Sequence, residues 1–206
     1  MKTNLYKLVF ALTILLILPK WCHALDFTAS YDVYMVPNVS NNYDDGRGFT
    51  LGVNHPIWKD LSGRVEAVHI SDIDFPCKED PKGSWGELRG YGAFWNVFYT
   101  LKYDERLSFV LYGGAGPVWW QFRENPALQD AGVTVRTDPS LVLKTGILID
   151  YKIREGWKIE LGAGWMDTNI HKVATDDSGT VWNILDADET IGWQAVTYKV
   201  GIVKKF

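Results

Sequence analysis

The chain has 206 residues, of which 47% are hydrophobic and 22% are charged. A hydrophobic content near one half excludes wholesale disorder, and the modest charged fraction excludes a low-complexity or coiled-coil chain. The formal net charge of −4 gives no electrostatic reason to expect nucleic-acid binding, which needs a basic surface. Nineteen Gly with ten Trp, ten Tyr and nine Phe favour a sheet protein with tight turns over a helical bundle.

The N-terminal segment has the features of a secretory signal peptide. Lys2 and Lys7 precede the apolar run Leu8–Leu18, and a cleavage site is predicted after Ala24. The run is too short to cross a bilayer as a helix, which takes roughly 20 residues. We therefore expect residues 1–24 to be a signal peptide, with a membrane anchor as the alternative. Residues 25–206 would then form one exported domain with 18 basic residues, 25 acidic residues and one cysteine, Cys77.

Regular alternation of apolar and polar side chains marks the strands. In Leu141–Ile153, Trp157–Trp165 and Tyr91–Tyr103 nearly every second residue is apolar or aromatic, and a period of two indicates strands. These runs exceed the about five or six residues of soluble strands and suit the roughly 9–11 of a tilted transmembrane strand. Aromatic residues lie near the strand ends, as in the interfacial girdles of membrane barrels: Tyr91, Tyr103, Tyr151, Trp157 and Trp165.

The spacing of the strands predicts the fold. Eight strands are expected, at residues 26–36, 47–56, 63–71, 88–103, 107–122, 141–153, 157–167 and 190–206. Their connections alternate between long ones of roughly 10 to 22 residues and short ones of about three to six. This asymmetry is typical of outer-membrane barrels, which have short periplasmic turns and long external loops. We therefore predict an all-β fold, an eight-stranded antiparallel up-and-down transmembrane β-barrel.

The last strand and two internal segments resemble known outer-membrane barrels. Tyr198, Val200 and Ile202 alternate toward Phe206, which resembles a C-terminal assembly signal, although Lys204 stands where an apolar residue is usual. This implies the barrel-assembly machinery as a partner during biogenesis.

The stretch L-S-F-V-L-Y-G-G-A-G-P-V-W-W at Leu107–Trp120 is similar to the strand "PYVGAGxGY" of small eight-stranded barrels of the OmpA/OmpW-like superfamily. Leu141–Asp167 is similar to the hairpin that follows it. The resemblance implies the fold and a place in the outer membrane of a Gram-negative-type bacterium. It does not imply one function, because the same barrel carries plugs, narrow channels, adhesins and enzymes.

The faces opposite the apolar ones carry charges that should point into the barrel. Eight strands leave an interior just wide enough for side chains. Oppositely charged residues on adjacent strands would therefore form a satisfied internal network, with a conducting pore as the alternative. The predicted network consists of Lys144, Asp150, Lys152, Lys158 and Glu160.

One local motif suggests an enzyme. The run R-V-E-A-V-H-I-S, which ends at Ser71, resembles the H-x-S motif of PagL-type lipid A deacylases. The resemblance implies Ser71 as nucleophile and His69 as base, and we nominate Glu87 as the carboxylate that orients the histidine. The motif lies on the third strand rather than a late one, and Asp72 replaces the usual Asn. The alternative is an interfacial polar pair, and the hydrolase requires His69 to face the lipid.

The sequence therefore favours a non-catalytic outer-membrane barrel that acts as a monomer. Its loops would contact outer-membrane lipid and lipopolysaccharide, small solutes or host surfaces. No cofactor is expected, and no metal site, because one Cys and three His in residues 25–206 have no usable ligand spacing. A lipid A deacylase and a narrow channel for small apolar solutes are the alternative functions.

Overall fold

The structure is a computed structural model that describes residues 25–35, 45–76, 84–180 and 188–205. The predicted signal peptide, Cys77 and Phe206 lie outside the described residues. Within these ranges the chain forms nine strands and one short helix. In chain order they are β1 (Asp26–Met35), β2 (Gly46–Trp58), β3 (Leu61–Pro76), β4 (Ser84–Lys102), β5 (Leu107–Glu124), α2 (Pro126–Asp130), β6 (Thr134–Thr137), β7 (Ser140–Arg154), β8 (Trp157–Thr175) and β9 (Asp188–Lys205).

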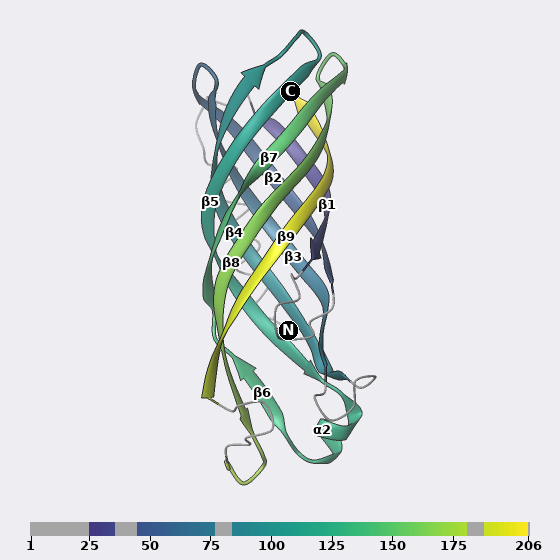
Figure 1. The fold of residues 1–206 in the computed structure, drawn as a ribbon, viewed down its shortest axis with the longest axis vertical. Coiled ribbons are helices and arrows are strands. Elements are labelled where there is room, and N and C mark those ends of the chain that lie inside the picture. Colours follow the sequence, from purple (N-terminus) through teal and green to yellow (C-terminus); the bar gives the residue numbers. More distant parts are fainter. Residues whose placement is uncertain (1–24, 36–44, 77–83, 181–187, 206) are drawn as a thin grey trace.

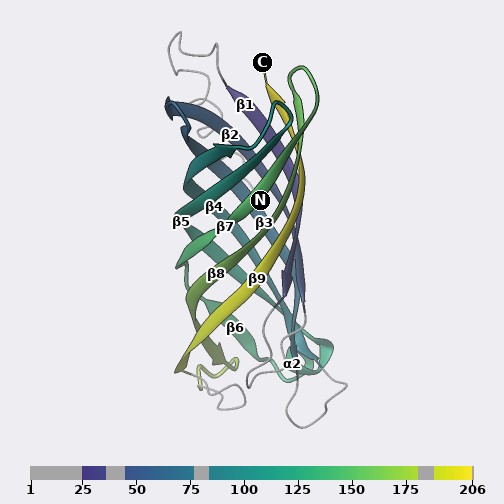
Figure 2. The same cartoon turned by 45° about the horizontal axis from the view of Figure 1, so that its top comes forward.

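Eight of the strands close into an antiparallel barrel (Figure 1), which confirms the predicted fold class. The order around the wall is β8-β7-β5-β4-β3-β2-β1-β9, and the pairing of β8 with β9 closes the ring. Barrel strands that follow one another in the chain are neighbours in the wall, so the topology is up-and-down. Figure 2 shows the strong tilt of the strands around an elongated barrel.

The two ends of the barrel differ. At one end, called the turn end, the strands are joined by the short connections 59–60, 103–106 and 155–156. Asp104 Oδ1 accepts the backbone N–H groups of Arg106 and Leu107 at 2.7 Å each, and these bonds hold the pKa of the Asp104 carboxyl below its usual range. The opposite end, called the loop end, carries α2 and β6 (Figure 1).

The strands extend further toward the loop end than the sequence predicts. β8 continues to Thr175, where its last residues pair with both β9 and β6. Residues 168–175 of the connection predicted between 167 and 190 are therefore strand, and the connection predicted between 122 and 141 contains α2 and β6. A small apolar cluster packs α2, β6 and the end of β8 together. It consists of Leu128, Val133, Val135 and Ala174. None of the described helices has the length and apolar character needed to cross a bilayer.

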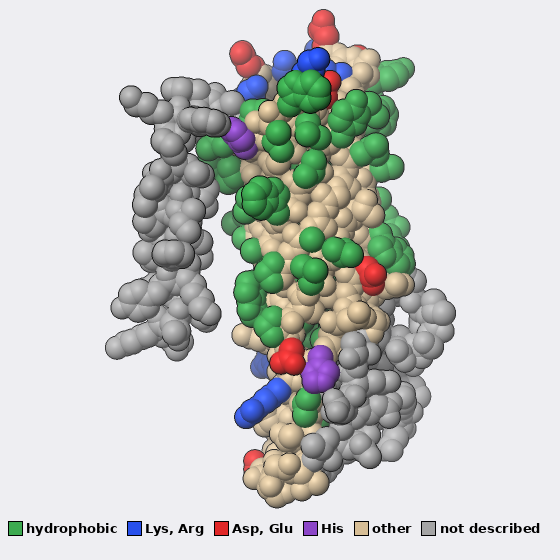
Figure 3. Space-filling model, turned by 90° about the vertical axis from the view of Figure 1, so that its left-hand side faces the viewer, with side chains coloured by type: hydrophobic (Ala, Val, Ile, Leu, Met, Phe, Trp, Pro, Cys, Tyr) green, Lys and Arg blue, Asp and Glu red, His purple; other side chains and the backbone are tan. Residues whose placement is uncertain are grey.

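Exposed apolar side chains on all eight strands form a belt around the barrel wall. Figure 3 shows part of this belt on one face of the barrel. On β5 the outward-facing belt runs from Leu107 to Trp119. At about 3.3 Å per residue this is about 40 Å along the strand, which a tilt of about 40–45° reduces to about 30 Å of height. That height matches the hydrocarbon core of a bilayer. The belt ends in exposed aromatic residues, with Trp58 and Tyr103 at the turn end and Tyr91 and Trp119 at the other.

We predict that Ile147→Arg destabilises the barrel. Ile147 is 52% exposed in the middle of the belt, and an arginine at a bilayer midplane costs about 2–4 kcal/mol. Urea unfolding in phospholipid vesicles measures this free energy. The control is Gln121→Arg, an exposed position on the loop side of the belt, where we expect about 0–1 kcal/mol. Equal effects at both positions would contradict the placement of the belt in lipid.

Candidate functional site

The loop half of the barrel interior is filled by an apolar core. Trp120 and Trp193 meet edge to face with ring centroids 5.6 Å apart, and Tyr34 lies 6.3 Å from Trp193. The Trp120 indole N–H donates to Ser140 Oγ at 2.7 Å. These side chains belong to one cluster of buried residues: Tyr34, Val68, Ile70, Ile73, Leu88, Phe94, Val118, Trp120, Val142, Met166, Ile170, Trp193 and Ala195.

The middle of the interior is organised around the carboxylate of Glu66, which is 1% exposed. Its Oε1 lies 3.3 Å from Lys199 Nζ and 3.5 Å from Arg64 Nη1. Its Oε2 accepts hydrogen bonds from Asn96 Nδ2 at 2.9 Å and from Lys144 Nζ. Because a buried carboxylate is tolerated only when opposite charges and hydrogen bonds compensate it, these four partners account for its burial.

Arg64 links this centre to a second carboxylate. Its guanidinium donates from Nη1 to Glu160 Oε2 at 3.0 Å and from Nη2 to Glu160 Oε1. Its Nε donates to Asn54 Oδ1, and its charge lies 4.3 Å from the centroid of the Phe98 ring. Such a bidentate pair is strong and fixes geometry. Arg64, 2% exposed, therefore joins the carboxylates of β3 and β8 across the interior.

The predicted interior network is present in part. Lys144 and Glu160 lie in it, and Lys158 Nζ contacts Asp150 Oδ2 at 3.2 Å. Lys152 does not lie in it: this residue is exposed near the turn end of β7, where the barrel opens to solvent. The sequence prediction omitted Arg64, Glu66 and Lys199, although the alternation on β3 and β9 places all three on inward faces.

A glycine on β5 makes room for the network. Gly114 is opposite Asn96 in the β4–β5 register, and a Cβ on it would collide with Asn96 Oδ1 and the backbone oxygen of Trp95. Any larger residue would displace the amide that donates to Glu66. Gly114 therefore allows close packing inside a narrow barrel, which is a common role of glycine within a strand.

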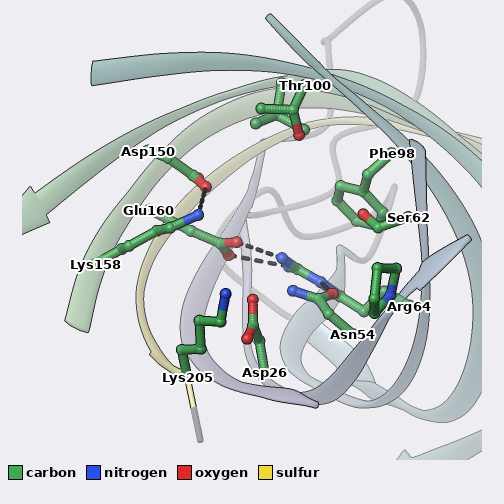
Figure 4. A pocket seen from close by; sticks show the side chains of 12 residues that line it. Asp26, Asn54, Ser62, Arg64, Phe98, Thr100, Asp150, Lys158, Glu160 and Lys205 are labelled. Carbon is green, nitrogen blue, oxygen red and sulfur yellow. Dashed lines mark hydrogen bonds and ion pairs between the residues drawn. The ribbon is translucent and has the colours of Figure 1, made fainter. Parts of the chain in front are cut away.

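Between the network and the turn end lies a cavity of about 150 Å³. Figure 4 shows its charged side chains, with Arg64 and Glu160 joined to each other and Lys158 joined to Asp150. Asp26 and Lys205, which are register partners on β1 and β9, lie nearer the chain termini in the same lining.

On the outside wall, β3 presents the proposed catalytic pair. Arg64, Glu66 and Ile70 are buried inside, whereas His69 and Ser71 are on the outward face. The His69 ring stacks on Tyr91 with centroids 4.6 Å apart, and His69 Nδ1 is buried without a hydrogen-bond partner. Ser71 Oγ instead lies 3.4 Å from the backbone oxygen of Arg47.

The nominated carboxylate is engaged elsewhere. Glu87 accepts two hydrogen bonds from Arg89, at 2.7 and 2.8 Å, and one from the backbone N–H of Asp72 at 3.2 Å. The hydrogen bonds from Arg89 hold the pKa of the Glu87 carboxyl below its usual range. The structure thus gives His69 and Ser71 the facing that a hydrolase needs, but it does not join His69 to Ser71 or Glu87 by a hydrogen bond.

The C-terminal residues of the predicted assembly signal face outward. Tyr198, Val200 and Ile202 are 48%, 57% and 50% exposed. Lys204 places its ammonium 4.9 Å from the centroid of the Trp157 ring, which explains how a lysine fits this position at the edge of the belt. No group of three or more His, Cys, Asp or Glu side chains in the described residues has a metal-binding arrangement.

A closed eight-stranded wall, an apolar belt of bilayer height and short turns at one end define a small transmembrane β-barrel. Solved structures with this fold are similar over 89% of the chain. They include OprG of Pseudomonas aeruginosa (TM-score 0.69, 10% identity, 96% of that chain), Neisserial surface protein A (0.55, 10%, 96%) and outer membrane protein W of Escherichia coli (0.54, 10%, 98%). No protein-family model matches the chain, and no curated protein sequence matches it. The chain therefore shares the fold of small outer-membrane barrels.

We predict that Glu66→Gln lowers the free energy of unfolding by about 3–5 kcal/mol, because it leaves three buried cations without their shared anion. Urea unfolding followed by heat-shifted gel mobility measures the change. Asp60→Asn is the matched control, since its partner Lys102 is 3.8 Å away and both are exposed, so about 0–1 kcal/mol is expected. A Glu66→Gln effect as small as that of the control would show that the network contributes little.

Proposed function

We propose that this chain is a non-catalytic outer-membrane protein: a closed, monomeric barrel whose loop end contacts lipopolysaccharide. The observation that carries the proposal is the filled interior. Trp120 and Trp193 meet in the loop half, and the Glu66 centre occupies the middle. A narrow channel for small apolar solutes would require the apolar core to part.

The lipopolysaccharide contact is supported by charges just beyond the belt. Arg47 on β2 and Arg123 on β5 are exposed on the loop side of Phe49 and Trp119, at the level where lipid headgroups begin. Arginine suits phosphate groups because its planar guanidinium forms two parallel hydrogen bonds. The phosphates of lipopolysaccharide lie at this level of an outer leaflet, so these arginines are the contacts we propose.

The proposed biogenesis follows from the C-terminal strand. Tyr198, Val200 and Ile202 present an alternating apolar edge to the outside of β9, which suits recognition by the barrel-assembly machinery. The monomeric state is supported by the closed ring, which leaves no unpaired strand edge in the belt.

The closed interior predicts the electrical behaviour of the protein. Folded full-length protein in planar lipid bilayers should show no long-lived open steps, because the apolar core blocks water and ions. Trp120→Ala combined with Trp193→Ala removes the two indoles of this core and should produce openings. Trp119→Ala, which removes an outward-facing indole, should not. Regular openings of the unaltered protein would contradict the proposal.

Density-gradient fractionation should find the protein with outer membranes.

The arginine contact predicts a selective loss of lipid binding. Arg47→Gln combined with Arg123→Gln should weaken binding to lipopolysaccharide by about thirtyfold or more, because each of the two lost charge-assisted contacts is worth about 1 kcal/mol or more. Binding of the nanodisc-embedded protein to lipopolysaccharide micelles measures this. The control is Arg106→Gln combined with Lys152→Gln, which removes the same charge at the turn end. Equal losses in both double variants would indicate a nonspecific charge effect and contradict the proposed site.

The second candidate function is lipid A ester hydrolysis by His69 and Ser71. It is favoured by the position of both side chains on the outward face of β3. Mass spectra of lipid A from bacteria expressing the protein or its Ser71→Ala variant separate the two candidates. We expect identical spectra, because His69 stacks on Tyr91 and Glu87 is paired with Arg89. Loss of one acyl chain with the unaltered protein only would establish the hydrolase and overturn the non-catalytic proposal. Heat-shifted gel mobility confirms that both proteins fold.

A further inference from the structure

The cavity at the turn end has features that neither the closed interior nor the loop-end contact explains. It lies inside the barrel beneath the Glu66 centre and has a volume of about 150 Å³. Cavities of this size hold small organic molecules in other proteins. Its side chains come from both halves of the wall, and Figure 4 shows the charged ones grouped around one space.

The side of the cavity nearest the barrel centre is already satisfied. Arg64 and Glu160 are 2% and 1% exposed and make two hydrogen bonds to each other. Their charges therefore need no ligand. This pair lies between the cavity and Glu66 and forms the inner end of the cavity lining.

Asp150 carries unused hydrogen-bonding capacity. It lines the cavity and is 7% exposed, and its Oδ2 receives Lys158 Nζ at 3.2 Å. Its Oδ1 is buried and has no hydrogen-bond partner. A buried acceptor without a donor loses free energy compared with a satisfied one. Rotation about the Cβ–Cγ bond exchanges the two oxygens, so the carboxylate can receive a second donor from the cavity.

A second pair of opposite charges lies nearer the chain termini. Asp26 and Lys205 are direct register partners on β1 and β9, and both line the cavity. No ion pair joins their side chains to each other or to another described residue. The cavity thus offers a carboxylate and an ammonium that remain available, in addition to the open acceptor of Asp150.

The charges that line the cavity are balanced. Three carboxylates, on Asp26, Asp150 and Glu160, face three cations, on Arg64, Lys158 and Lys205. A ligand with a net charge would disturb this balance in a partly desolvated space. A ligand that carries both signs would not, because each of its charged groups meets the opposite charge.

We propose that this cavity binds a small zwitterion with an ammonium and a carboxylate, of the amino-acid type. Its ammonium donates to Asp150 and Asp26, and its carboxylate accepts from Lys205. The proposal concerns the turn end of the barrel and is independent of whether the loop end binds lipopolysaccharide.

The test uses full-length protein folded in detergent micelles and three probes of similar size. β-Alanine carries both charges, ethylamine only the ammonium and propionate only the carboxylate. Isothermal titration or perturbation of backbone amide signals measures the affinity. We expect β-alanine to bind at least about tenfold more tightly than either single ion, since it keeps both sets of charged contacts. Equal affinities for the three probes would overturn the proposal.

Two variants locate the site. Asp150→Asn and Asp26→Asn should each weaken β-alanine binding by about tenfold, because each removes an anionic acceptor. Glu155→Gln removes the same charge from an exposed turn outside the cavity and should leave binding unchanged. Unchanged affinity in Asp26→Asn would overturn the proposal. If Asp150→Asn does not fold, the three-probe comparison and Asp26→Asn still decide the outcome.

Discussion

Glu66 is a carboxylate that faces the axis of the barrel, where it receives cations from three separate parts of the wall. Arg64 comes from β3, Lys144 from β7 and Lys199 from β9. An ionised carboxylate in this position is strongly unfavourable without those partners. Arg64 lies two residues away on the same strand, but Lys144 and Lys199 reach Glu66 only when the ring is closed. A slip of one residue in the pairing of β3 would turn Glu66 toward lipid and bring Val65 inside. The ion network thus stabilises one register against its neighbours.

The interior is divided along its length, and this division decides what the barrel can do. Apolar side chains around Trp193 fill the loop half and keep water away from that side of the ion centre. On the other side the cavity leaves the charges of Asp150 and Lys158 close to solvent. The two sides therefore differ in what they admit. The apolar loop side excludes water, whereas the turn side has polar groups and space for a small solute.

The strands that depend on local alternation and the closed eight-stranded barrel could be predicted from the sequence, whereas the strand ends beyond the lipid belt could not. The strand Leu141–Ile153 and its turn to Trp157 follow from a period of two and a short polar connection. The extension of β8 to Thr175 was missed because most of its outward residues beyond the lipid belt are polar, including Asn169 and His171, so the segment resembles a loop.

The site shows the same limit. The inward facing of Lys144 and Glu160 follows from alternation, but the partners of each do not. Arg64 and Glu160 are 96 positions apart in sequence and meet across the barrel, so only the register of every intervening pair brings them together. Lys152 has the same facing pattern as Asp150 but lies too near the end of β7 to be covered. Depth along the axis, which periodicity does not report, decides which charges become buried.

The register that builds the ion network also decides which side chains of β3 face outward. Because Arg64 and Glu66 point inward, His69 and Ser71 must point outward, so the facing required by a hydrolase arises from packing alone. Catalysis would need a further element, a carboxylate that orients the imidazole. The bulge between Ile70 and Ile73 instead turns the N–H of Asp72 toward Glu87, whose two oxygens also bind Arg89. Recruiting Glu87 to His69 would break these charge-assisted bonds at an exposed headgroup level. The arrangement therefore favours a structural role for the pair, in which stacking on Tyr91 fixes the histidine ring.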